Sequence, residues 1–583
     1  MKRLAGVGAS VAAVLLAAAL LVPWPALGAR VLAALVDARG AEFAVRIERS
    51  VALTTPDGVR LVADVYHPQP AGQWPTILVR LPYDHTFRTR AFASSVGHLW
   101  AARGYTVVIQ GTRGRYESGG RHRPFLDERG DGIATLAWIA RQAWYDGRIG
   151  TWGGSYFGYT QWAIADQRGP GPTALMIQLA STDVYGTLYP GGAFALASAL
   201  YWALRSRGDR DDPPTAAAIA RGADGVSLIE ADDRAGTDVP AFNEWVTHPR
   251  RDAYWKAVDG ERRAARLTAP VHLMGGWYDP FLPTQLADYV TIRRETAPEI
   301  SAATRLVIGP WGHATAVTLP GGRRGSDYRL ASLAPTLAWF DRHLARRPAG
   351  PDPAPVRLFV MGANVWREEG EWPLARAREA AFYLQSRGHA NSAAGDGVLH
   401  LTPPMGAERP DTFVYDPARP VPTAGGALLG PGAGSALQAE IERRDDVLVY
   451  TSEPLPRPLE ITGPVTAVLH LATTAPHTDV TAKLVDVHPD GAAWSVTDGI
   501  ARQAFSPGVH QIRVDLWPTS MRFDRGHRLR LQISSSNVPR FDRNPNTGAD
   551  IATERRLVVA RQTVHHGVTT PSRLLLPVVD GAP

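Results

Sequence analysis

Cysteine is absent from the 583 residues of the chain. This absence excludes disulfide bonds, thiolate metal sites and a catalytic thiol, so the folded state must rest on packing. Long runs of one charge are missing too: the net charge is only +6, and no five or six basic residues stand together. A basic run would be needed to follow a phosphate backbone, so we expect no nucleic-acid partner.

Apolar residues, by contrast, are plentiful. They make up 45% of the chain, with 8% aromatic residues, which is enough to fill well-packed cores. A chain of this length exceeds what one hydrophobic core supports, so two or three domains are expected.

The N-terminus has the pattern of an export signal. Lys2 and Arg3 precede an uncharged Ala/Leu/Val run at residues 5–22, and small residues at 26–29 offer a cleavage site. We therefore expect residues 1–29 to direct export to the periplasm or the cell exterior. The alternative is an uncleaved membrane anchor, since about 18 apolar residues are the lower limit for a spanning helix.

Between residues 51 and 183, short β-rich runs alternate with helical ones. The runs at 76–80 and 105–110 are apolar, and residues 132–144 repeat their apolar positions at helical spacing. Apolar strands separated by helices predict a parallel sheet covered on both faces. Residues 184–266 contain few β-rich runs and are predicted to form an inserted helical cap.

Strand-like runs resume after the cap, at 271–274 and 305–308. A helix is predicted from Pro335 to Leu344, because proline suits the first turn of a helix. The first domain is thus expected to be discontinuous, with its two parts at 30–183 and 267–347.

A proline-rich segment, 347–355, marks the expected boundary of a second domain at 348–583, because proline fixes φ and lacks a donor. Beyond it, strand-like runs are separated by Gly, Pro and Asp turns: 466–471, 480–487, 510–516 and 529–534. This pattern predicts a β-sandwich or jelly roll.

Ser155 stands in a glycine-dense turn, IGTWGGSYFGY, between a short strand and a helical run. Glycines allow the sharp bend of a nucleophile elbow, which exposes the serine oxygen at the edge of a sheet. The spacing departs from G-x-S-x-G, since Phe157 takes the place of the last glycine and Gly158 comes one residue later. The alternative is a tight strand-to-helix turn without a catalytic role.

A serine nucleophile needs a histidine base and usually a carboxylate, which in this fold follow in the order Ser, Asp/Glu, His. Two loops fit, each directly after an apolar strand: GGWYD, which ends at Asp279, and GPWGH, which ends at His313. Asp183 is the rival acid, and we favour Asp279. For the oxyanion, the backbone N–H of Tyr156 is one expected donor, and Tyr83 is either a second donor or a packed loop residue.

Seven motifs along the chain can be compared with known families: RLPYD (80–84), GTRGRYESGG (111–120), GGSYFG (153–158), GGWYD (275–279), GPWGH (309–313), VMGANVW (360–366) and SSSNVPRFDRNPNTG (534–548). Together these motifs resemble the cocaine esterase and X-Pro dipeptidyl-peptidase family of serine hydrolases (CocE/NonD type). That family includes α-amino-acid ester hydrolases and glutaryl-cephalosporin acylases. The late glycine of the elbow is the spacing that this family uses.

The resemblance implies a fold and a set of roles. The fold is an α/β-hydrolase core with an inserted helical cap and a C-terminal jelly roll of galactose-binding-like shape, which we expect to be structural. Ser155, Asp279 and His313 are implied as the triad, with the Tyr83 hydroxyl and the Tyr156 N–H as the oxyanion hole. No cofactor and no metal are expected, since the 542–550 loop matches a family loop and lacks an EF-hand pattern.

The composition of the predicted cap limits the class of substrate. A buried ammonium must be paired, so enzymes that act on free α-amino substrates need carboxylates near the acyl site. Residues 184–208 contain no Asp or Glu, although Glu230, Asp232 and Asp233 could still fold inward. We expect an exported esterase or acylase that acts on small esters or amides with apolar acyl groups. The alternatives are an X-Pro dipeptidyl-peptidase, an α-amino-acid ester hydrolase, and a non-catalytic binding protein on a hydrolase scaffold.

Overall fold

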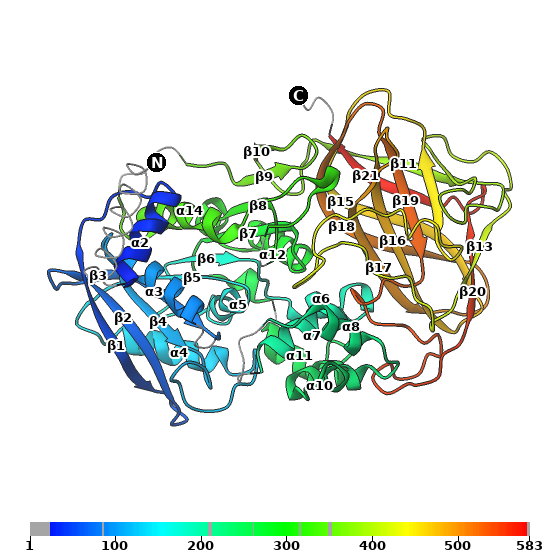
Figure 1. The fold of residues 1–583 in the computed structure, drawn as a ribbon. Coiled ribbons are helices and arrows are strands. Elements are labelled where there is room, and N and C mark those ends of the chain that lie inside the picture. Colours follow the sequence, from blue (N-terminus) through cyan, green and yellow to red (C-terminus); the bar gives the residue numbers. More distant parts are fainter. Residues whose placement is uncertain are drawn as a thin grey trace, which may run out of the picture.

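The structure is a computed structural model that describes residues 24–83, 87–207, 213–260, 262–313, 316–347 and 352–579. Figure 1 shows an α/β part at the left, an all-β part at the right, and a group of helices below and between them. The predicted α/β-hydrolase core is confirmed, and the C-terminal domain is all-β.

The core is one ten-stranded sheet in the order β1-β2-β4-β3-β5-β6-β7-β8-β9-β10. Its strands are β1 (Ala44–Thr54), β2 (Arg60–Gln69), β3 (Trp74–Leu81), β4 (Thr106–Gly111), β5 (Tyr145–Gly154), β6 (Ala174–Gln178), β7 (Val271–Tyr278), β8 (Arg305–Gly312), β9 (Val356–Val360) and β10 (Val365–Glu369). Neighbouring strands from β4 to β9 are parallel, so their carboxyl ends meet at one edge. That edge is where ligands bind in open α/β sheets.

Helices cover both faces of this sheet: α2 (Trp24–Leu35), α3 (Phe87–Ala101), α4 (Glu128–Ile139), α5 (Tyr156–Trp162), α12 (Leu282–Glu295), α13 (Pro298–Ala303) and α14 (Tyr328–His343). Alternate residues of β3 enter different cores. Ile77 packs with residues of α3 and α14, whereas Leu78 packs with Leu136 of α4. This alternation explains why the strands are apolar throughout rather than on every second residue.

The first described helix, α2, contains the residues predicted to form a cleavage site, 26–29. It packs closely on α3: Ala29 is buried, and a Cβ on Gly28 would lie 2.0 Å from Ser95 Oγ. Residues 1–23, which hold most of the predicted export signal, lie outside the described residues. In the described ranges, the helices lack the combination of length and hydropathy that a membrane span requires.

Between β6 and β7, the described residues form helices and no strand. The helices of this cap are α6 (Val184–Leu188), α7 (Leu196–Arg205), α8 (Ala216–Ala223), α9 (Ala231–Ala235), α10 (Pro240–Thr247) and α11 (Ala253–Asp259). Their apolar sides form a core of their own, which also includes Leu428 and Val538 of the C-terminal domain. The cap therefore packs against both the core and the C-terminal domain.

No helix occurs between residues 352 and 579. The strands of the second sheet are β11 (Ala377–Gln385), β12 (Val398–His400), β13 (Asp411–Tyr415), β14 (Leu448–Ser452), β15 (Leu459–Thr473), β16 (His477–Val487), β17 (Ala493–Ala504), β18 (His510–Phe523), β19 (Arg528–Ser534), β20 (Ala560–His565) and β21 (Arg573–Val579). The long strand β15 pairs with β18, β20 and β21, which brings distant parts of the chain together.

The start of one helix differs from the sequence expectation. Helix α14 begins at Tyr328 rather than Pro335, because the Asp327 side chain caps it by accepting from the Arg329 N–H, and Pro335 lies inside the helix. Strands β9 and β10, which follow the expected domain boundary at residue 348, belong to the first sheet, where β9 pairs with β8 in parallel.

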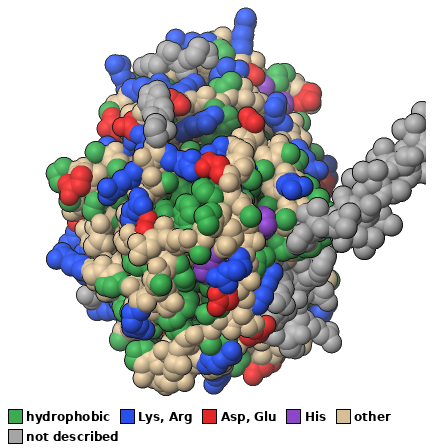
Figure 2. Space-filling view, turned by 90° about the vertical axis from the view of Figure 1, so that its left-hand side faces the viewer, with side chains coloured by type: hydrophobic (Ala, Val, Ile, Leu, Met, Phe, Trp, Pro, Cys, Tyr) green, Lys and Arg blue, Asp and Glu red, His purple; other side chains and the backbone are tan. Residues whose placement is uncertain are grey.

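On one face of the α/β part, the charged side chains do not gather by sign. Figure 2 shows basic and acidic groups interspersed over the face that it presents, with apolar side chains between them. A mixed surface like this agrees with the small net charge of +6. It offers no broad basic stripe on that face.

Candidate active site

Ser155 lies between β5 and α5, at the carboxyl edge of the sheet. Its backbone has φ 59° and ψ −131°, a conformation that a non-glycine residue rarely adopts and that is typical of strained functional turns. The Ser155 N–H donates to Gln178 O of β6 at 2.9 Å, and Ser155 O accepts from the N–H groups of Gly158 and Tyr159. Sheet and helix thus hold the serine in this conformation.

Two glycines make the turn possible. Gly153 has φ +155°, and a Cβ there would lie 2.2 Å from Phe157 Cδ2. A Cβ on Gly158 would lie 2.7 Å from Ala180 Cβ, so this late glycine lets α5 approach the end of β6. The unusual spacing of the elbow therefore has a packing reason: the ring of Phe157 fills the space beside Gly153, and the close contact with β6 falls one residue later.

Three side chains, each directly after a different strand, are connected in series by hydrogen-bond contacts. His313 Nε2 lies 2.6 Å from Ser155 Oγ, and His313 Nδ1 lies 2.6 Å from Asp279 Oδ2. Asp279 is fully buried, and its Oδ1 accepts from the Phe281 N–H at 2.8 Å. With Nδ1–H directed to the carboxylate, Nε2 is free to accept the serine proton.

Asp183, the rival acid, has other partners. Its side chain caps α6 by accepting from the Gly186 N–H at 2.6 Å and pairs with Arg251 at 2.5 Å. The structure therefore brings Asp279, and not Asp183, to the histidine.

Tyr83 lies two residues after β3, at the same edge. Its hydroxyl donates to Ser155 Oγ at 3.3 Å, and its ring packs edge-on against Phe157. The hydroxyl thus lies beside the serine oxygen. Asp84, the last residue of the RLPYD motif, lies outside the described residues.

Tyr156, which follows the nucleophile, is anchored from behind. Its hydroxyl donates to Glu128 Oε1 at 2.8 Å and accepts from the Phe125 N–H at 2.9 Å. Burial raises the pKa of Glu128, while the ion pair with Arg80, at 2.8 Å, favours the charged form. Burial and this neighbouring carboxylate hold the pKa of Tyr156 well above its usual range. The anchored side chain fixes the orientation of the Tyr156 backbone N–H beside Ser155.

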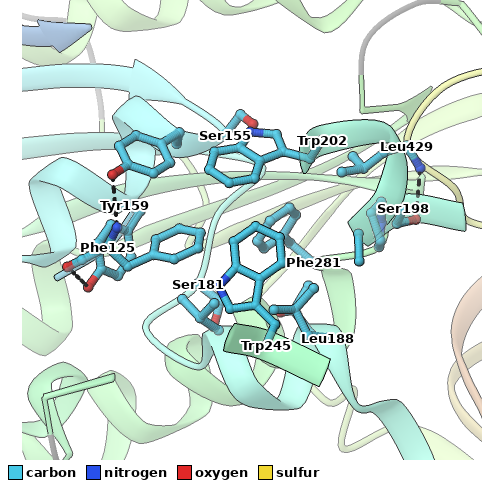
Figure 3. A pocket seen from close by; sticks show the side chains of 15 residues that line it. Phe125, Ser155, Tyr159, Ser181, Leu188, Ser198, Trp202, Trp245, Phe281 and Leu429 are labelled. Carbon is cyan, nitrogen blue, oxygen red and sulfur yellow. Dashed lines mark hydrogen bonds between the residues drawn. The ribbon is translucent and has the colours of Figure 1, made fainter. Parts of the chain in front are cut away.

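A pocket opens beside Ser155, with an empty volume of about 610 Å³ that includes its open mouth. Figure 3 shows its wall: the rings of Phe125, Trp202, Trp245 and Phe281 stand around a space next to the serine. None of the 15 described residues that line it is charged. Such a cavity suits an uncharged apolar group.

The sequence did not predict which residues line the pocket, and those outside the cap include Phe125 and Leu429. Phe125 lies in the loop before α4, and Leu429 belongs to the C-terminal part of the chain. The Leu429 N–H donates to Ser198 Oγ of the cap at 3.1 Å, a bond drawn in Figure 3. The C-terminal domain thus contributes to the pocket wall. No local pattern marks Leu429, since its role depends on a contact between residues 231 positions apart.

Comparisons with known proteins identify the family of the chain. The family model of the X-Pro dipeptidyl-peptidase (S15 family) matches residues 57–315, and that of the X-Pro dipeptidyl-peptidase C-terminal non-catalytic domain matches residues 350–575. The cocaine esterase of Rhodococcus sp. (strain MB1 Bresler) is 38% identical over 566 residues, which cover 90% of this chain and 97% of that protein. The chain belongs to this family of serine hydrolases.

Solved structures share the fold of this S15-family hydrolase. The aminopeptidase from the marine sediment archaeon Thaumarchaeota archaeon superposes with a TM-score of 0.77 at 23% identity, covering 93% of this chain and 97% of the other. An α-amino acid ester hydrolase superposes with a TM-score of 0.75 at 22% identity, covering 92% and 97%. These matches extend over the core, the cap and the C-terminal domain. The activity class that follows from family membership is ester or peptide hydrolysis.

Proposed function

We propose that this chain is an exported esterase or acylase that transfers an uncharged, largely apolar acyl group to Ser155 and then to water. The pocket carries this proposal, because its described wall is aromatic and aliphatic and offers no charged side chain. The 38% identity to a protein named as an esterase supports the ester side of the proposal. Export rests on the sequence of residues 1–29 alone.

In the proposed reaction, Ser155 Oγ attacks the acyl carbonyl while His313 Nε2, at 2.6 Å, takes the serine proton. The buried Asp279 carboxylate stabilises the imidazolium that results. The Tyr83 hydroxyl and the Tyr156 N–H stabilise the oxyanion. His313 then protonates the leaving group. In the second half of the reaction, water attacks the acyl-enzyme while His313 takes its proton, and the carboxylic acid leaves as the Ser155 oxygen receives that proton.

Among the described residues, two carboxylates near the pocket are already engaged. Asp288, behind Ser181 of the pocket wall, accepts from the Ser181 hydroxyl at 2.7 Å and from the N–H and hydroxyl of Thr182. Burial raises the pKa of Asp288 to about 7. Glu128 is paired with Arg80 and bonded to Tyr156. Neither carboxylate is free to pair with a substrate ammonium, which disfavours substrates with a free α-amino group.

A matched pair of substrates tests the proposal: the 4-nitrophenyl esters of 3-phenylpropionate and of phenylalanine, which differ only in the ammonium. Leaving an ammonium unpaired in the pocket costs several kcal/mol, so we expect kcat/KM to be at least about 100-fold higher for the phenylpropionate ester. Equal or faster turnover of the phenylalanine ester would contradict the proposal. Release of nitroaniline from Gly-Pro-4-nitroanilide at a comparable rate would instead indicate a dipeptidyl-peptidase.

A further inference from the structure

Within the described residues, one group of three side chains outside the pocket places metal-ligating atoms close together: Asp486, His488 and His527. One ligand atom from each lies within 4.8 Å of the others. Asp486 is in β16, His488 directly follows that strand, and His527 precedes β19. We refer to the three as the Asp–His–His cluster. It lies in the C-terminal domain, and the active-site chemistry does not use it.

The two imidazoles approach opposite oxygens of the same carboxylate. His527 Nδ1 lies 2.8 Å from Asp486 Oδ1, and His488 Nε2 lies 3.2 Å from Asp486 Oδ2. The two rings are also close to each other, with centroids 4.3 Å apart. Oδ2 is buried, and the approach of His488 does not have hydrogen-bond geometry. One oxygen of a buried carboxylate is thus left without a hydrogen-bond donor.

The carboxylate also lacks a strong cation. Asp486 is 1% exposed, and its ion pairs among the described residues are with these two histidines alone. A buried carboxylate is expected to be paired with a cation or to coordinate a metal. A cation placed between the three side chains would satisfy the unpartnered oxygen and both ring nitrogens together.

The fold holds the three side chains in place. Strands β16 and β19 pair antiparallel, with Asp486 opposite Leu529, so the ends of both strands lie side by side. The turn after β16 is closed by the His488 N–H, which donates to Ala492 O. The turn before β19 is closed by the His527 N–H, which donates to Asp524 O. Ligands on strand ends and closed turns need little reorganisation to bind an ion.

We propose that the Asp–His–His cluster binds one divalent transition-metal ion, with Zn²⁺ as the best fit. Two imidazole nitrogens and one carboxylate oxygen are ligands that Zn²⁺ takes readily, and water would complete a tetrahedron. With Zn–N distances of about 2.0–2.1 Å, ligand atoms in a tetrahedron are roughly 3.3 Å apart, so the observed separations need only small side-chain movements. The side chains of His488 and His527 are 24% and 15% exposed, which gives an ion access from solvent.

The bound ion would connect two turns of the C-terminal sheet. It would therefore stabilise the folded domain by mass action and leave turnover at Ser155 unchanged.

Titration calorimetry with ZnCl₂ tests the proposal on the tag-free, chelator-treated full chain. We expect one equivalent of Zn²⁺ to bind, and His488→Gln and His527→Gln each to weaken its affinity at least about 100-fold, since loss of a ligand should exceed the effect of losing a supporting residue. His400→Gln is the control, because His400 is exposed in the same domain, and it should bind as the parent chain does. Equal affinity in the parent and in both cluster variants would overturn the proposal.

Two further measurements cover variants that fold poorly and ions that bind elsewhere. X-ray absorption at the zinc edge of the parent chain should show two imidazole ligands, and a spectrum with one or none would contradict the site. Added Zn²⁺ should raise Tm in the parent and in the His400→Gln chain but not in the His488→Gln chain. An equal rise of Tm in all three would also contradict it.

Discussion

In the part of the chain that the structure describes, hydrogen-bond contacts connect a serine, a histidine and an aspartate in two clusters: Ser155, His313 and Asp279 in the core, and Ser386, His566 and Asp411 in the C-terminal domain. Their composition is the same, but the histidine uses its two nitrogens differently. In the core cluster, Nδ1 faces a carboxylate and Nε2 faces the serine. That division leaves one nitrogen able to accept a proton.

The second cluster has no such division. His566 Nε2 lies 2.9 Å from Asp411, and its Nδ1 lies 2.7 Å from Glu408. Ser386 donates to Asp411 at 2.7 Å, as does the Tyr450 hydroxyl. Burial opposes the charged imidazole, but the bonds and charges of the two carboxylates outweigh it and raise the pKa of His566. Because both ring nitrogens of His566 face carboxylates, the ring has no nitrogen reserved for the proton of a hydroxyl.

The comparison teaches that the three residue types do not make a catalytic triad by themselves. What matters is which partner each ring nitrogen faces, and whether the serine borders a cavity. In the core cluster, Ser155 lines the apolar pocket. In the second cluster, the histidine, His566, is fully buried among its partners. The predictions below test this difference.

Replacing each of the two serines by alanine should give the largest difference in turnover. Ser155→Ala removes the proposed nucleophile and should lower turnover of an activated ester by on the order of 10⁶-fold. Ser386→Ala removes only a donor to Asp411 and should leave turnover within about twofold of the parent value. Initial rates with a 4-nitrophenyl ester measure both. Comparable losses in the two variants would remove the distinction between the clusters.

Replacing the two candidate acids by asparagine should give the second largest difference in turnover. Asp279→Asn keeps the shape of the side chain but favours the wrong tautomer of His313, so we expect kcat to fall about 10³- to 10⁴-fold. Asp183→Asn, which alters only a helix cap and an ion pair, is the matched control and should retain most of the activity. A crippled Asp183→Asn enzyme beside a mild Asp279→Asn enzyme would show that the wrong acid was chosen.

Tyr83→Phe should have a smaller effect. Loss of one preorganised oxyanion donor costs roughly 10²- to 10³-fold in kcat, with KM nearly unchanged because the bond strengthens mainly in the transition state. The ring remains, so its packing against Phe157 should survive. A folded variant within about threefold of parent turnover would assign the oxyanion to main-chain donors alone.

The smallest effect concerns the stability contributed by the second cluster. The folded-state pKa of His566 is raised, so its contribution is complete below its unfolded pKa, about 6.5, and is lost as pH rises through the folded pKa. The free energy of unfolding should therefore fall above pH 6.5, by at most about 1.4 kcal/mol per pH unit for this one proton.

Urea unfolding over a pH series measures this slope. His566→Gln should remove the His566 part of the slope, and the exposed-site variant His400→Gln should keep it. The prediction fails if the parent chain and His566→Gln have the same slope.

Much of the core could be predicted from the sequence because its signals are local. Ser155, Asp279 and His313 each follow directly after an apolar strand, and parallel strands end at one edge of a sheet. The same strand–turn–helix pattern places Ser155 between β5 and α5.

What the sequence did not reveal depends on long-range contacts. Leu429 reaches the pocket only because the C-terminal domain packs on the cap. The Asp–His–His cluster forms through pairing of β16 with β19, two strands that are separated by β17 and β18 along the chain. The start of α14 was misplaced because the cap at Asp327 outweighed the preference of Pro335 for a first turn.

The most direct test of the account is to find which serine forms the covalent intermediate. The native full chain is treated with a fluorophosphonate, its intact mass is measured, and the modified peptide is sequenced by mass spectrometry. The account predicts a single adduct, on Ser155, that does not form in the His313→Ala chain. An adduct on Ser386 or on any other residue, with Ser155 unmodified, would contradict it.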